Sequence, residues 1–145
     1  MRGPYHEFVA VAEREQPRAA YLSLLHSPEA VRVADDLVRY IGDTLDWVPS
    51  SNPAGGESRQ TGLNYFGPTI IDPPATAQLA RIIRSWIAIF RLGPERLQLR
   101  GWWSETDQAY ERLEFERAAL IAVLEQLEAM TERVGPGEYL VHLGI

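Results

Sequence analysis

The spacing of large apolar residues between Asp72 and Arg91 constrains the fold more than any other feature. Apolar side chains recur there every three or four residues, which places them on one face of a helix. They are Leu79, Ile82, Ile83, Trp86, Ile87 and Phe90. Asp72-Pro73-Pro74 supplies a capping residue and early prolines, and Gly93-Pro94 ends the segment. The sequence therefore predicts an amphipathic helix over 72–91.

Three later or flanking segments have the composition of strands. Apolar and polar side chains alternate from Leu97 to Trp103, which predicts a strand after the helix. Glu138–Leu143 is expected to form a closing strand, and Leu63–Ile71 a strand interrupted by Gly67-Pro68. Residues 49–62 combine proline, glycine and small polar side chains without periodicity, which is typical of a loop.

The first third of the chain is less decisive. Tyr5–Ala12 fits a strand by alternation or a short helix by spacing, and the helix is the preferred interpretation. Ser27-Pro28-Glu29 has the residues of a helix start, with a cap, a first-turn proline and an early carboxylate. The buried stripe of that helix would be Val31, Ala34, Leu37, Val38, Ile41 and Leu45.

The longest helix is predicted from Ser104 to about Val134, because Ser104 and Asp107 nearly match a capping box. Its apolar stripe would be Tyr110, Leu113, Leu120, Leu124 and Leu127. Together the elements predict an α+β fold with a small mixed or parallel sheet of three to four strands, packed against three to four helices. The last of these is the long acidic C-terminal helix. A chain of 145 residues fits a single globular domain spanning 1–145.

The negative charge is concentrated in that last predicted helix. Residues 105–132 hold eight acidic residues and two arginines, which accounts for the whole net charge of −6. A helical projection gathers most of the acids beside the apolar stripe. Such a face is either a solvated surface that keeps the protein soluble or a docking surface for a basic partner. The candidate partner-binding residues are Trp102, Asp107, Glu111, Glu114, Phe115, Glu125, Glu128 and Glu132.

Composition excludes several classes of chemistry. The chain has no cysteine, so it has no disulfide, thiolate nucleophile or cysteine-ligated zinc. All fourteen basic residues are arginine, so there is no phosphate-loop or Schiff-base lysine. We expect no cofactor and no metal site. Nucleic-acid binding is disfavoured because the concentrated field is negative, and the arginines at 81, 84 and 91 are interpreted as a solvated helix face.

The cellular context is also bounded by the sequence. The longest apolar stretches fall far short of the roughly 20 residues that a spanning helix needs. The first residues reach an acidic side chain at once, without the apolar core of a signal peptide. The expectation is a cytoplasmic protein with no membrane contact, monomeric or a weak homodimer.

An enzyme is the alternative hypothesis. Glu138 and His142 would share a strand face, so a carboxylate could orient a histidine base, and Tyr65 could complete a cleft beside the 49–62 loop. The reaction would be a small hydrolase or transferase step. An ordinary strand histidine is the preferred interpretation of His142.

The chain resembles the small immunity proteins that neutralise bacterial polymorphic toxins. The resemblance is carried by 62–71 (GLNYFGPTII), the acidic segment and 139–145 (YLVHLGI), and covers the layout of about the last 85 residues. It implies a stoichiometric inhibitor that covers the active site or substrate groove of a toxin. The leading hypothesis is therefore a non-enzymatic protein that binds a basic protein partner through its acidic helix.

Overall fold

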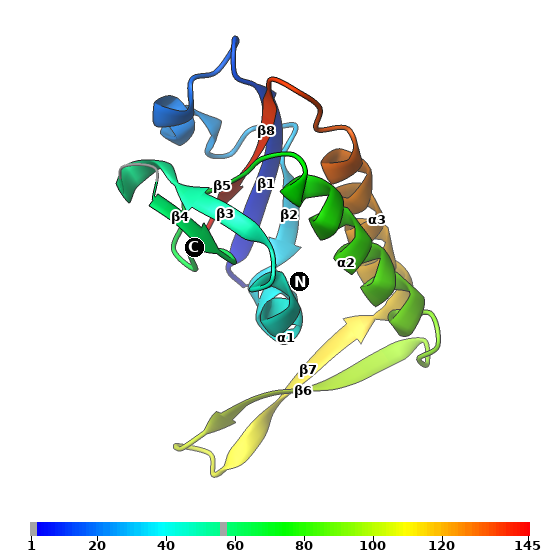
Figure 1. The fold of residues 1–145 in the computed structure, drawn as a ribbon. Coiled ribbons are helices and arrows are strands. Elements are labelled where there is room, and N and C mark those ends of the chain that lie inside the picture. The colour runs from blue at the N-terminus through cyan, green and yellow to red at the C-terminus, as the bar shows by residue number, and fades with distance from the viewer. Residues whose placement is uncertain (1–2, 56–57) are drawn as a thin grey trace.

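The computed structural model describes residues 3–55 and 58–145, and combines helices with two antiparallel sheets (Figure 1). The larger sheet has six strands in the order β2-β1-β8-β5-β3-β4. Their bounds are β1 Tyr5–Ala12, β2 Val31–Ala34, β3 Pro49–Asn52, β4 Ser58–Thr61, β5 Thr69–Ile71 and β8 Glu138–Leu143. The second sheet is a hairpin of β6 (Arg96–Ser104) and β7 (Ala109–Glu116). The helices are α1 Asp35–Leu45, α2 Ala75–Phe90 and α3 Arg117–Glu132, with short 3-10 segments η1 Arg18–Leu24 and η2 Pro53–Gly55.

The α+β class is confirmed, but the sheet differs from the expected one. It has more strands than predicted, and the strand pairs recorded within residues 3–55 and 58–145 are all antiparallel. The predicted helix over 72–91 corresponds to α2, and the predicted strands at Leu97–Trp103 and Glu138–Leu143 correspond to β6 and β8.

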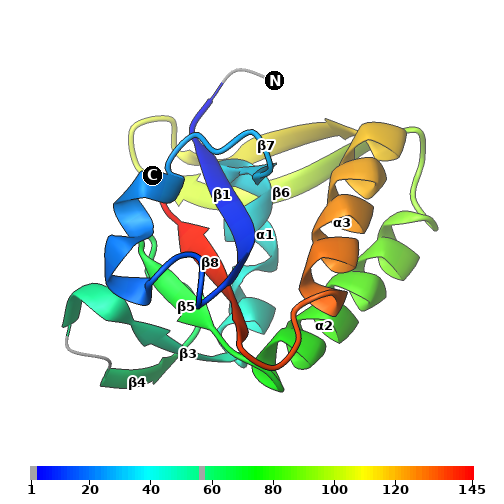
Figure 2. The ribbon, with the colours of Figure 1, turned by 90° about the horizontal axis from the view of Figure 1, so that it is seen from above.

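The six-stranded sheet is covered on both faces. One face packs against α1, α2 and α3 in a large apolar core that includes Phe8, Leu37, Ile83 and Leu124. The opposite face carries a smaller core in which Leu24 of η1 joins apolar residues of β1, β5 and β8. Figure 2 shows η1 on one side of the sheet and the pair α2 and α3 on the other. Central strands are therefore buried on both faces.

This two-sided burial explains why Tyr5–Ala12 is a strand and the preferred helix is wrong. β1 lies between β2 and β8, and residues 6–9 are all buried. A strand buried on both faces loses the alternation that identifies strands in a sequence. Long-range pairing of 138–143 with 7–12 decides the conformation, and that information is not local.

The helix expected from Ser27 begins later. Val31–Ala34 forms β2, and α1 starts at Asp35, although Leu37, Val38, Ile41 and Leu45 are buried as expected. Residues 49–62 are not a plain loop, because β3, η2 and β4 lie within them, while positions 56 and 57 fall outside the described residues. Of the strand expected at 63–71, only 69–71 pairs, as β5.

The long acidic helix is the main correction. Ser104 ends β6, residues 105–108 turn, and Ala109–Glu116 runs back as β7, so the last helix is only α3. The capping interaction does form, because the Asp107 N–H donates to the Ser104 hydroxyl at 3.2 Å. Gln108 then takes a left-handed conformation with φ of 50°, which turns the chain back instead of continuing a helix. Leu113 and Phe115 alternate inward from a strand.

Candidate functional site

Arginines compensate most of the carboxylates that were expected to form an acidic docking face. Arg84 of α2 binds Glu128 at 2.7 Å and also binds Glu132, and Arg91 binds Glu125 at 3.1 Å, so these pairs join α2 to α3. On the hairpin, Arg39 binds Glu111 at 3.2 Å and Arg96 lies 3.9 Å from Glu114. The picture of an outward, uncompensated acidic helix is therefore wrong. The roles predicted for these residues in partner binding stay predictions.

The β6–β7 hairpin has two unlike halves. Near its base, Leu97, Leu113 and Phe115 turn inward and are buried in the main core. Beyond this base the ribbon extends away from the six-stranded sheet (Figure 1), and nearly every residue from 102 to 112 is exposed. Phe115, which sequence reasoning placed away from the core, is 4% exposed and cannot anchor a partner in this conformation.

Three large aromatic residues stand in the solvent-exposed half, which we call the hairpin end (residues 100–112). Trp102 is 60% exposed, Trp103 45% and Tyr110 53%. Trp103 packs edge-on against Tyr110 at a ring-centroid distance of 5.1 Å, and the Arg100 guanidinium lies 5.0 Å from the Tyr110 ring centroid. Exposed aromatic groups of this size are costly to hydrate and are preferred anchors of protein interfaces.

A bulge directs the two indoles to opposite faces of the hairpin. The strand register shifts between Arg100 and Trp103, where Gly101 and Trp102 together oppose Glu111. Gly101 permits this close approach, since a Cβ there would lie 2.8 Å from the Glu111 Cβ. Trp102 consequently faces α1, where the Arg39 guanidinium lies 4.6 Å from its ring. Trp103 shares the outer face with Arg100.

At the turn of the hairpin, two carboxylates have no arginine partner among the described residues. Glu105 and Asp107 interact with Gln108 and Ser104 by hydrogen bonds. Asp107, one of the predicted partner-binding residues, is therefore exposed beside the aromatic side chains. The hairpin end combines aromatic anchors with a small negative tip.

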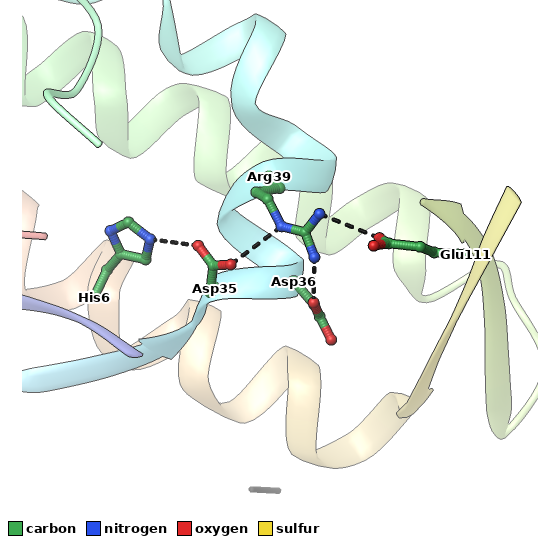
Figure 3. A network of polar contacts seen from close by, with 5 residues as sticks. All are labelled: His6, Asp35, Asp36, Arg39 and Glu111. Carbon is green, nitrogen blue, oxygen red and sulfur yellow. Dashed lines mark hydrogen bonds and ion pairs between the residues drawn. The ribbon is translucent and has the colours of Figure 1, made fainter. Parts of the chain in front are cut away.

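A buried polar network lies beneath α1 and ends at the hairpin (Figure 3). Asp35 receives a hydrogen bond from His6 Nε2 at 2.8 Å and one from Arg39 Nε at 3.1 Å. Arg39 also binds Asp36 at 2.6 Å and Glu111 at 3.2 Å. The Arg39 guanidinium thus links α1 to β7, and Asp35 links it to His6 of β1.

The network continues from His6 across the sheet. His6 Nδ1 lies 2.7 Å from His142 Nε2, and His142 Nδ1 lies 3.1 Å from the Thr69 hydroxyl. Burial, then the charge of His6, lowers the pKa of His142 to about 3, so this ring is neutral near pH 7. The Asn64 N–H donates to the Thr69 oxygen at 2.8 Å, which ties the chain to the loop before β5.

Asp35, His6, His142 and Thr69 therefore form one continuous hydrogen-bonded chain. Tyr65 closes one side, with its ring 5.5 Å from His6, and burial followed by the Asp35 carboxylate raises the pKa of the Tyr65 hydroxyl. Both histidines are fully buried, so the arrangement stabilises the sheet and gives no direct access to a substrate.

The residues of the enzyme hypothesis are only partly brought together. Tyr65 lies near the histidine pair, but Glu138 is at the other end of β8, where it accepts a hydrogen bond from the Gly135 N–H at 3.3 Å. The groove between α2 and β3–β4 and the groove beside β6 are not lined by His142, Tyr65 or Glu138. His6 and Asp35 are the partners of His142 that sequence spacing did not reveal, because they become neighbours only through strand order.

A groove with a volume of about 1080 Å³ lies between α2 and strands β3 and β4. Arg18, Arg59 and Arg81 line it together with small hydroxyl and amide side chains. Arg18 is already held by Asp72 at 2.5 Å and by Glu13 at 3.1 Å. These ion pairs satisfy the most enclosed arginine of the groove within the protein.

Comparison of the chain with protein-family models, with curated proteins and with solved structures found no match. Two findings concern the described residues directly. Within 3–55 and 58–145, no helix has the length and apolar character needed to cross a membrane. In the same ranges, no group of three or more histidine and acidic side chains is arranged to hold a metal ion.

Proposed function

We propose that this protein is a non-enzymatic binding protein whose hairpin end docks on a protein partner. The observation that carries the proposal is the exposure of Trp102, Trp103 and Tyr110 on a ribbon that is solvated on both faces. An isolated two-stranded ribbon gains little stability from such residues. Buried in an interface, the same side chains would each cover a large apolar area at low entropic cost.

The hairpin end also suggests the chemistry of the partner surface. Glu105 and Asp107 at the turn favour basic groups around the aromatic pocket, because complementary charge speeds association and selects among partners. The expected partner is therefore a protein with an apolar pocket and a basic rim. This retains the sequence-based hypothesis of a basic partner but moves it from a helix face to a hairpin. The resemblance to immunity proteins stays a prediction. It predicts that the partner is a toxin.

The proposal is tested by comparing three forms of the protein as bait in lysate of the native host. The double variant Trp103→Ala with Tyr110→Ala removes two anchors from a solvated surface, and Trp47→Ala removes an exposed indole elsewhere. A genuine partner is retained by the wild type and by Trp47→Ala but lost by the double variant. Its purified form should bind the double variant about 30-fold more weakly, as expected for hot-spot residues.

Two results would contradict the proposal. Equal binding of the partner to wild type and double variant would show that the hairpin end is not its docking surface. Recovery of nucleic acid alone, sensitive to the double variant and to salt, would assign the aromatic residues to base stacking instead.

A further inference from the structure

The edge of β6 that faces away from β7 borders an apolar groove. β6 pairs with β7 alone among the strands of residues 3–55 and 58–145. A cavity of about 470 Å³ is lined by four consecutive β6 residues, 96–99, and by no residue of β7. Consecutive strand residues point to opposite faces, so both faces of β6 contribute. The groove therefore runs along the open edge of β6, where alternate N–H and C=O groups point outward.

The other wall of the groove is aromatic and aliphatic. Tyr40 of α1 and Trp86, Ile89 and Phe90 of α2 line it. Trp86 stacks on Phe90 at 5.5 Å and meets Tyr40 edge-on at 5.9 Å. An open strand edge beside such a wall suits an extended peptide, since the backbone can pair while alternate side chains enter the groove.

Charge on the outer face of β6 narrows the choice of occupant. Arg96, Gln98 and Arg100 point to this face, and Arg100 stands directly opposite Arg112 in the ladder. Like charges directly opposite each other destabilise a hairpin. A carboxylate on a third strand beside Arg100 would relieve that repulsion. A second copy of β6 would not, because antiparallel pairing centred on Gln98 sets Arg96 against Arg100.

We propose that the β6 edge and its groove bind an extended segment of a partner protein. The segment has acidic side chains beside Arg96 and Arg100 and apolar side chains at the alternate positions beside Leu97 and Leu99. This goes beyond the proposed function, because the groove is lined by residues 96–99 at the base of the hairpin, about 13–23 Å along the strand from Trp103. Loss of binding through the hairpin end and loss of binding here are separately measurable.

The test uses the full chain, labelled with ¹⁵N, and the synthetic peptide Ser-Gly-Asp-Val-Thr-Val-Asp-Gly-Ser. Binding should shift the amide signals of 96–100, and the matched peptide with lysine in place of both aspartates should bind at least about tenfold more weakly. Arg100→Glu replaces an exposed side chain and places an opposite charge across from Arg112. It should reduce the affinity ratio between the aspartate and the lysine peptides severalfold. The amide spectrum of the variant shows independently whether it is folded.

Backbone pairing is tested on the peptide, so the protein stays unchanged. Two versions of the peptide carry N-methyl groups on alternate amides. One version is methylated on the odd-numbered residues and the other on the even-numbered residues. Only one set can face β6, so one version should bind like the parent and the other about tenfold more weakly. Equal binding of both versions, or no shifts at 96–100 with millimolar peptide, overturns the proposal. Shifts at 96–100 that depend on protein concentration without peptide would assign the edge to a second copy and overturn it too.

Discussion

Replacing His142 by glutamine should remove a defined part of the acid sensitivity of the fold. Burial and the neighbouring His6 lower the pKa of His142 to about 3 in the folded protein. A histidine in the unfolded chain titrates near pH 6.5. As the pH falls below about 6.5, the unfolded chain therefore binds a proton that the folded protein excludes. The free energy of unfolding decreases until the pH reaches about 3.

The size of the effect follows from that window. Well inside this pH range, each pH unit lowers the free energy of unfolding by about 1.4 kcal/mol for one group. Between pH 7 and 5 the unfolded histidine passes from mostly neutral to almost fully charged, while folded His142 stays neutral. The contribution of His142 to this loss is about 2 kcal/mol. The groups that face His142 are His6 at 2.7 Å, Thr69 at 3.1 Å and the Phe8 ring at 5.1 Å, and the first is the only titratable one.

Glutamine is the appropriate replacement because its amide can donate to His6 and does not titrate. Urea unfolding at pH 7, 6 and 5, at constant ionic strength, gives the free energy of unfolding of both proteins. The wild type should lose about 2 kcal/mol more than His142→Gln between pH 7 and 5. Gly42→Ala, where a Cβ meets nothing within 4 Å, changes no titratable group and should leave the wild-type slope unchanged. Parallel curves for wild type and His142→Gln would refute the reasoning.

Three further predictions concern the backbone and the polar network. Gly144→Ala should abolish or strongly destabilise the fold in thermal melts followed by circular dichroism, because its Cβ would lie 2.1 Å from the Tyr65 carbonyl oxygen. Gly42→Ala in α1, where a Cβ meets nothing within 4 Å, should instead stabilise by about 0.5–1 kcal/mol. Arg39→Met should lower the free energy of unfolding by about 1–3 kcal/mol, because buried Asp35 loses a partner, and should move the indole N–H signal of Trp102 in NMR spectra. An unchanged Trp102 signal would show that Arg39 does not hold the hairpin end.

The sequence predicts elements well where a local pattern and the tertiary environment agree. α2 has one apolar face, and its six stripe residues include Leu79, Ile83 and Ile87, which are almost fully buried. β8 follows a glycine- and proline-rich turn and has the expected bounds. In both segments the spacing of side chains and the direction of the core give the same answer.

Prediction fails where two local signals compete. Ser104 and Asp107 make the capping contact of a helix start, yet the following residues alternate as a strand with Leu113 and Phe115 inward. The apolar spacing of Leu120, Leu124 and Leu127 is helical, and extending it backward over β7 produced a helix of twice the true length. The chain turns back at Gln108, whose φ is positive, and no glycine marks that position in the sequence.

The candidate site was accessible to sequence reasoning only in part. Trp102 is among the predicted partner-binding residues and is exposed. Trp103 is not among them but is exposed too, and Phe115 is among them but is buried. The bulge at Gly101 decides which indole faces which side, and a bulge depends on the pairing register with β7. His6 and Asp35 lie 29 residues apart, so their contact requires the sheet order and the start of α1 to be known.

The structure gives the acidic and the aromatic residues roles opposite to those that composition suggested. Most of the acidic residues expected at the surface form ion pairs within the protein, and aromatic residues of the hairpin end are exposed. Ion pairs from Arg84 and Arg91 hold α2 against α3, and Arg39 joins the hairpin to α1 through Glu111. Exposed pairs of this kind add little stability, but each one removes an outward negative charge from the surface. Arg39 also stacks on Trp102, so the residue that holds the buried histidine network also orients one indole of the hairpin end. The exposed side chains of the hairpin end include Trp102, Trp103 and Tyr110, so the docking proposed there depends first on apolar contact and second on charge.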